Sequence, residues 1–238
     1  MASKSHRFAA PVAGFLLAAS LSGCAASQTV DSALLSVVYN HAPPAAFKVP
    51  LSWNQVDGPA LAREVQGVQE ATGGSSGADM VAFEPSPGPR ASDFLAFGIT
   101  RPFMFIEYGR LNSAARRQMS DGYLHDFYLP VTAAARHKAA AQGIPLTGFR
   151  LVRDQVLVLG HGVHGVRETY DYTYTGYTDT FDVDAVTNIG HDAIFLVALH
   201  CTTACYGKYR TEIEAIMSSV SAISLVPEPP MWAGLVGR

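Results

Sequence analysis

Alternation of apolar and polar residues is clearest in the second half of the chain, where it predicts antiparallel strands. Side chains that share one face of a strand recur at every second residue. The alternating runs are residues 147–152, 155–159, 166–175 and 180–187. We expect Arg153-Asp154 to form the turn of a hairpin between the first two runs. Residues 193–201 are almost wholly apolar and follow a turn-like string at 188–192, which predicts a strand in the centre of the sheet.

Apolar residues at helical spacing mark three further segments. These segments are residues 60–68, 113–142 and 208–223. In the long middle segment an apolar residue recurs at every fourth position from Met119 to Val131, and Pro130 should kink or split the helix. Shorter strands are expected in the amino half, at residues 47–53, 80–83, 94–100 and 103–108.

These elements predict an α+β domain with a single antiparallel meandering sheet flanked by helices. The connections between neighbouring strands are too short for parallel crossovers, which need a dozen residues or more. The domain should span residues 46–225, after a signal segment (1–23) and a flexible tether (24–45). Residues 226–238 are rich in proline and are expected to form a disordered tail.

The amino end has the pattern of an export signal. Lys4 and Arg7 precede an apolar run, residues 8–21, which is too short to span a bilayer. The run ends in the string LSGC at residues 21–24, which resembles the lipobox of bacterial lipoproteins. That resemblance implies cleavage before Cys24 and attachment of diacylglycerol and a fatty acid such as palmitate to this cysteine. The simpler alternative is an ordinary secretory signal followed by a chance cysteine.

Composition limits where and with what the protein acts. The 17 lysines and arginines against 20 acidic residues give a net charge of −3, which argues against a nucleic-acid partner. After the first 24 residues no apolar segment is long enough to span a membrane, so the acyl chains would be the whole anchor. Ala25, rather than an aspartate, follows the cysteine, which indicates sorting to the outer membrane with the domain facing the periplasm. An envelope protein is then a possible partner.

Two cysteines remain after Cys24, and they suit an oxidising compartment. Cys201 and Cys205 are four positions apart, and one helical turn would bring their Cα atoms within disulfide range. The alternative is two small buried thiols at a strand-to-helix corner. A redox or soft-metal site is less favoured, because three residues separate the cysteines instead of the usual two.

A serine hydrolase is one alternative function. Residues 73–77 match the nucleophile-elbow string G-x-S-x-G, with Ser75 or Ser76 as nucleophile and a histidine as base. The chemistry requires a strand before the serine and a helix after it. The predicted order here is the reverse, which favours a plain loop.

The remaining motifs suggest metals only weakly, and we assign no metal and no cofactor. His161 and His164 would chelate only from a loop, together with His191 or His200. Four aspartates suggest calcium: Asp171, Asp179, Asp182 and Asp184. We expect the last two to lie on a solvated face of their strand. The tyrosine stripe at 170, 172 and 174 should be part of the core.

The carboxyl half, residues 166–223, is similar in layout to the PsbP-like superfamily, which includes the mycobacterial LpqN-type lipoproteins. The matching features are a polar strand (168–177), an apolar return strand (193–201), a terminal helix with isoleucines and serines (212–219) and, more loosely, residues 47–53. This resemblance implies an antiparallel sheet flanked by helices and an accessory or binding role. We therefore expect a lipid-anchored, non-catalytic protein of the envelope. The alternatives are the hydrolase and a carrier of an apolar ligand between the sheet and segment 113–142.

Overall fold

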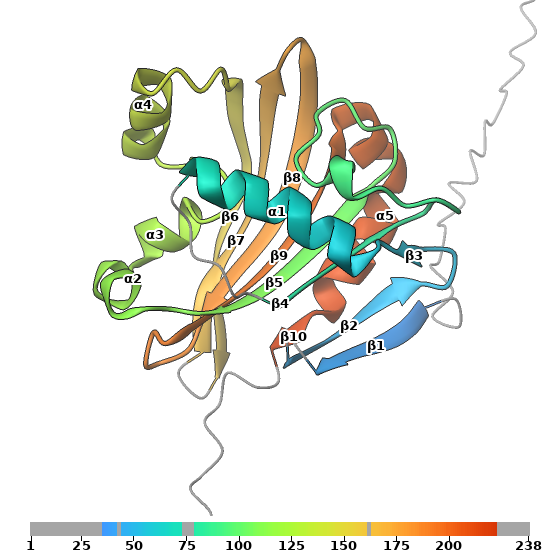
Figure 1. Ribbon diagram of the computed structural model, residues 1–238, viewed down its shortest axis with the longest axis horizontal. Coiled ribbons are helices and arrows are strands. Elements are labelled where there is room, and N and C mark those ends of the chain that lie inside the picture. Colours follow the sequence, from blue (N-terminus) through green and yellow to red (C-terminus); the bar gives the residue numbers. More distant parts are fainter. Residues whose placement is uncertain (1–34, 42–43, 73–78, 161–162, 223–238) are drawn as a thin grey trace, which may run out of the picture.

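A seven-stranded antiparallel sheet forms the centre of the computed structural model, which describes residues 35–41, 44–72, 79–160 and 163–222 (Figure 1). The strands in spatial order are β3 (Asn54–Gln55), β4 (Asp79–Glu84), β5 (Phe103–Arg110), β9 (Ala193–Thr202), β8 (Tyr177–Thr187), β7 (Val163–Tyr174) and β6 (Thr147–Gly160). Every pair of neighbours is antiparallel. The predicted α+β class and the meander of the last four strands are confirmed.

A smaller sheet of three strands lies beside the large one. It consists of β1 (Leu35–His41), β2 (Pro44–Pro50) and β10 (Ser221–Ala222), with β2 in the middle. Pro50 ends β2, in keeping with its missing N–H. β1 falls inside the range expected to be a flexible tether, so the structure differs from that expectation. The buried side chains of Phe47 and Val49 pack on the α5 side of the large sheet.

Helices cover both faces of the large sheet (Figure 1). One face carries α1 (Gly58–Thr72), α2 (Ser113–Gln118), α3 (Asp121–His125) and α4 (Ala133–Ala141), and the other carries α5 (Thr203–Ser219). Leu61 and Leu124 are buried in the first layer, whereas Ile213 and Ile216 of α5 are buried in the second. Within the described ranges, no helix is both long enough and apolar enough to cross a membrane.

The predicted middle helix is split into three short helices. The hydroxyl of Ser120 accepts a hydrogen bond from the backbone of Tyr123 and begins α3. The carboxylate of Asp126 then accepts hydrogen bonds from the backbone N–H groups of Val131 and Thr132. These side chains turn the backbone around Pro130, so the apolar stripe continues without a continuous helix.

Two strand predictions are wrong. The expected hairpin at Arg153-Asp154 does not form, because β6 runs through both residues and pairs with β7 along its length. The two charged side chains point to opposite faces of the strand: Arg153 binds Glu214 of α5, and the exposed Asp154 lies opposite Glu168 of β7. An alternating pattern cannot distinguish a turn from a pair of charges that the tertiary structure accommodates.

The expected strand at residues 94–100 is instead a 3₁₀ turn (Ala91–Asp93) followed by a loop. Gly98 has a φ of +81°, a conformation that glycine adopts readily. Its N–H donates to the carboxylate of Asp179 at 3.0 Å. This buried anchor holds the loop against the end of β8.

Candidate functional site

Several predicted site residues lie outside the described part of the chain. These are Cys24, Ser75, Ser76 and His161. The lipid anchor and the serine hydrolase therefore stay predictions.

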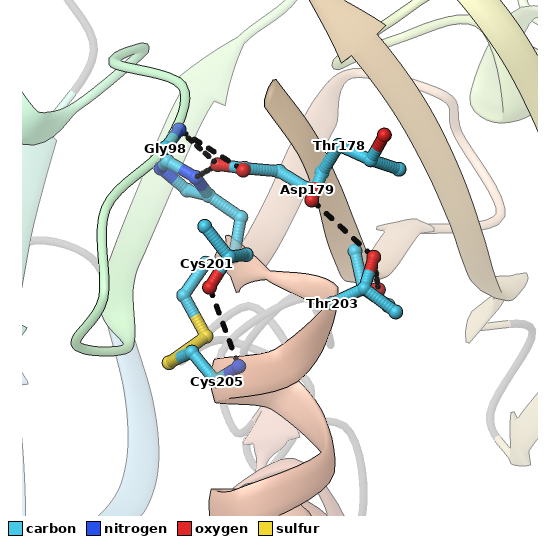
Figure 2. The surroundings of a disulfide bond; sticks show 9 residues. Gly98, Thr178, Asp179, Cys201, Thr203 and Cys205 are labelled. Carbon is cyan, nitrogen blue, oxygen red and sulfur yellow. Dashed lines mark hydrogen bonds and ion pairs between the residues drawn. A yellow bond between two sulfur atoms is a disulfide. The ribbon is translucent and has the colours of Figure 1, made fainter. Parts of the chain in front are cut away.

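The cysteine pair forms a disulfide at the corner between β9 and α5 (Figure 2). The Cα atoms of Cys201 and Cys205 are 5.9 Å apart. The hydroxyl of Thr202 caps the helix by accepting a hydrogen bond from the Cys205 N–H at 3.3 Å. So short a loop contributes about 2 kcal/mol through chain entropy. The bonded sulfurs leave no thiolate for a soft metal, so this corner is structural.

The histidines weighed as metal ligands lie in two separate places, and His161 is outside the described residues. His164 and His191 lie together, with their ring centroids 5.5 Å apart. His200 lies toward the opposite end of β9, where it stacks on Phe181 and its Nδ1 is 3.7 Å from Asp179. The two groups are separated by most of the length of β9, so one ion cannot join them.

Buried charges gather between the sheet and α5. The guanidinium of Arg167 on β7 lies 3.4 Å from Asp182, 3.6 Å from Asp184 and 3.3 Å from Glu214. Arg153 binds Glu214 from the other side at 2.6 Å. The prediction that Asp182 and Asp184 face solvent is wrong, since their exposed fractions are 0% and 6%. Helix α5 covers this face, and Arg167 supplies the opposite charge that makes burial tolerable.

The carboxylates of this cluster differ in their pKa values. Burial raises the pKa of Asp184 to about 7, against the attraction of Arg167. The hydrogen bond from Arg153 lowers the pKa of Glu214. Asp182 also accepts a hydrogen bond from Tyr206 of α5, but the Oδ1 atom of Asp184 has no hydrogen-bond partner in the described structure. This oxygen is buried and lies 3.6 Å from the guanidinium of Arg167, so an ion pair without a hydrogen bond is its contact in the described structure.

A partly open cavity of about 170 Å³ lies beside this carboxylate. Its lining residues are Leu157, Leu159, Arg167, Asp184, Val186, Phe195, Met217, Ser218 and Val220. Small-molecule sites usually have about 300–1,000 Å³. The cavity therefore suits a single side chain more than a complete organic ligand. Apolar walls and one buried ion pair would select a group with an apolar stem and a polar end.

Strand β6 forms both the rim of this cavity and the edge of the sheet. Its exposed large apolar residues are Leu151, Val152, Val156, Val158 and Leu159. Natural edge strands are usually protected by charges, prolines or bulges. Residues 155–160 contain no charge and no proline, and Val158 is 81% exposed. The pairing of β6 with β7 is irregular between Val158 and Gly160, so residues 155–158 form its regular apolar stretch. Among the residues that the structure describes, β6 has a strand only on its β7 side, so its outer backbone groups can pair with an added strand.

A second polar cluster lies on the opposite face of the sheet and was not predicted. It consists of His125, Asp154 and Glu168. The Nδ1 atom of His125 is 2.5 Å from Glu168, and burial raises the pKa of Glu168 to about 7. The three residues are distant in the sequence and form no recognisable motif. Strand pairing and the end of α3 bring them together, so periodicity alone gave no signal for them.

Comparisons with known proteins find similarity in fold alone. No protein-family model and no curated protein matches the chain. Among solved structures, the cyanobacterial PsbP (CyanoP) of Synechocystis sp. PCC 6803 is 13% identical, with 81% of this chain and 95% of that chain covered and a TM-score of 0.46. LpqN, involved in cell envelope biogenesis of Mycobacterium tuberculosis, is 14% identical, with 79% and 89% covered and a TM-score of 0.40.

A third similar structure comes from a eukaryote. The Ran-binding protein Mog1p of Saccharomyces cerevisiae is 9% identical, with 79% of this chain and 95% of that chain covered and a TM-score of 0.42. We argue function from the residues of this chain, because a fold does not specify a function.

Proposed function

We propose that the chain is a lipid-anchored, extracytoplasmic accessory protein of the bacterial envelope that acts by binding a partner protein and not by catalysis. The observation that carries this proposal is the signal pattern of residues 4–24, which ends at Cys24. The disulfide between Cys201 and Cys205 supports it, because such bonds persist mainly outside the cytosol. Ala25 directs the anchored protein to the outer membrane, with its domain in the periplasm.

The binding surface in this proposal is the outer edge of β6. A partner segment in extended conformation would add a strand to the sheet and gain main-chain hydrogen bonds. Val156 and Val158 would contact the partner on one face of the sheet, and Leu157 and Leu159 on the α5 face. The added strand would pair with the exposed backbone N–H and C=O groups of the β6 edge. It would also cover apolar side chains that would otherwise promote aggregation.

The cavity defines the chemistry of the partner segment. Three carboxylates face two guanidinium groups in the cluster, and the Asp184 acceptor that lacks a hydrogen bond lines the cavity. A lysine of the partner would place its apolar stem against Leu157 and Leu159 and its ammonium near Asp184. The proposed partner is therefore an envelope protein with an extended apolar segment that carries a basic side chain.

Photo-crosslinking in native cells tests the anchor and the edge together. A photo-reactive residue in place of Val158 should give an adduct with an envelope protein. The same residue in place of Leu51, which is also exposed and apolar but lies outside β6, should not. Val156→Lys places a charge on the edge and should abolish the adduct at position 158. Cys24→Ala should release the protein from membranes and also reduce the adduct.

The outcomes separate the two parts of the proposal. If the Cys24→Ala chain stays in the membrane fraction, the lipid anchor is refuted. If position 158 gives no adduct, or gives only a covalent dimer of this chain, the proposed heterologous partner is refuted. An adduct that survives Val156→Lys would place the contact away from the edge and would also refute the strand-addition mode.

A further inference from the structure

The second polar cluster is on the sheet face opposite the cavity, and its Asp154 lies two residues before Val156 on the same face of β6. We propose that His125, Asp154 and Glu168 form a binding site for a divalent transition-metal ion, for which Zn²⁺ is the probe. The proposal does not depend on the anchor or on a bound partner.

Three different elements bring the ligands together. His125 ends α3, Glu168 lies in β7, and Asp154 lies directly opposite Glu168 in β6. The Nδ1 atom of His125 and one carboxylate oxygen from each acidic residue all lie within 4.8 Å of one another. Ligand atoms in a tetrahedral zinc site are about 3.3 Å apart, given bonds of about 2.0–2.1 Å. To reach that spacing, His125 and Glu168, now 2.5 Å apart, would separate slightly, and the exposed Asp154 side chain would rotate inward.

The ligand types favour a transition metal over magnesium or calcium. One imidazole nitrogen and two carboxylates are a common donor set for zinc, whereas magnesium and calcium prefer oxygen alone. With a neutral imidazole, the two carboxylates carry the charge that balances a divalent cation. Three protein ligands leave a fourth position for water, and the part-exposed His125 and exposed Asp154 give an ion access from solvent.

One buried polar atom close to this cluster has no hydrogen-bond partner in the described structure. The next side chain on the same face of β7 after Glu168 is Tyr170, and its hydroxyl is that atom. Glu168, which is only 1% exposed, acts electrostatically on this hydroxyl. A cation bound at Glu168 would bring its water near the hydroxyl and supply a polar partner.

Isothermal titration of the metal-free mature protein in detergent with Zn²⁺ tests the site. We expect one ion per chain. His125→Gln and Asp154→Asn should each weaken binding by about tenfold or more, since each removes a ligand. Asp154 is exposed, so its amide variant should fold normally, as circular dichroism would check. His137→Gln and Asp121→Asn are matched controls at exposed positions and should bind as the unchanged protein does.

Three results would overturn the proposal. The first is a failure of the unchanged protein to bind Zn²⁺, and the second is binding by the His125 and Asp154 variants as tight as that of the controls. The third is a complete loss of binding in His191→Gln alone, which would assign the ion to the neighbouring pair His164 and His191. None of these results bears on the crosslink at position 158, so this inference and the proposed function fail separately.

Discussion

Strand β9 and residues 156–159 of β6 are both apolar runs but lie in opposite environments. β9 lies between β5 and β8, and its residues from Ala193 to Cys201 are buried. In the described part of the chain β6 has only β7 as a neighbour, and its Val156 and Val158 are exposed. For these two runs the difference comes from the position of each strand in the sheet and from what covers it. Apolar residues on β9 stabilise the fold, whereas those on β6 are available to another molecule.

The largest expected effect is on stability. Phe195→Ala in β9 removes a ring that is 1% exposed and should lower the free energy of unfolding by about 3–5 kcal/mol. Val158→Ala in β6 removes an exposed side chain and should change it by less than about 0.5 kcal/mol. Urea unfolding of both variants with the disulfide intact would measure the contrast. A cost above about 1.5 kcal/mol for the β6 variant would show that its side chain is packed in the monomer.

A smaller effect concerns Asp184, which lies on β8 between these two environments. Its pKa of about 7 in the folded protein exceeds the ordinary value of 3.8. Between these values the folded chain holds a proton that the unfolded chain has lost, so this contribution to stability is full below about pH 4 and is lost as the pH rises through 7.

The unchanged protein should lose stability as the pH rises from about 5 to 8. In Asp184→Asn this loss should be smaller, by an amount on the order of 1 kcal/mol. Unfolding by urea at several pH values would measure the slope, with the exposed Asp121→Asn as control. Some pH dependence should remain in the variant, because burial also raises the pKa of Glu107 and Glu168. Identical slopes with and without Asp184 would mean that water reaches this carboxylate freely, as it reaches the edge of β6.

The fold class and most strands of the second half could be predicted from the sequence. Alternation located β7 and β8, the continuous apolar run identified β9 as central, and the amphipathic pattern located α5. The pattern succeeded because burial in these elements follows the local period of the strand or helix. The sequence allowed either a disulfide or two free buried thiols at Cys201 and Cys205, and the structure contains the disulfide.

Features that depend on tertiary contacts were not predictable in this way. The pattern placed Asp182 and Asp184 in solvent, because nothing local shows that Arg167 and α5 cover them. The cluster around Glu168 likewise depends on strand pairing across β6 and β7. Sequence patterns assign polar residues to the surface, and this assignment fails for polar residues that are buried. In this protein those buried polar residues lie at the candidate sites.

Hydrogen exchange of β6 and β9 tests the central claim most directly. In the purified protein, the outward amides of residues 155–159 should exchange much faster than those of residues 194–199. In native envelope preparations, exchange in the β6 segment should slow by about tenfold or more while β9 is unchanged, because an added strand protects the edge. Equal exchange of β6 in both preparations would contradict the account of this edge as a binding surface.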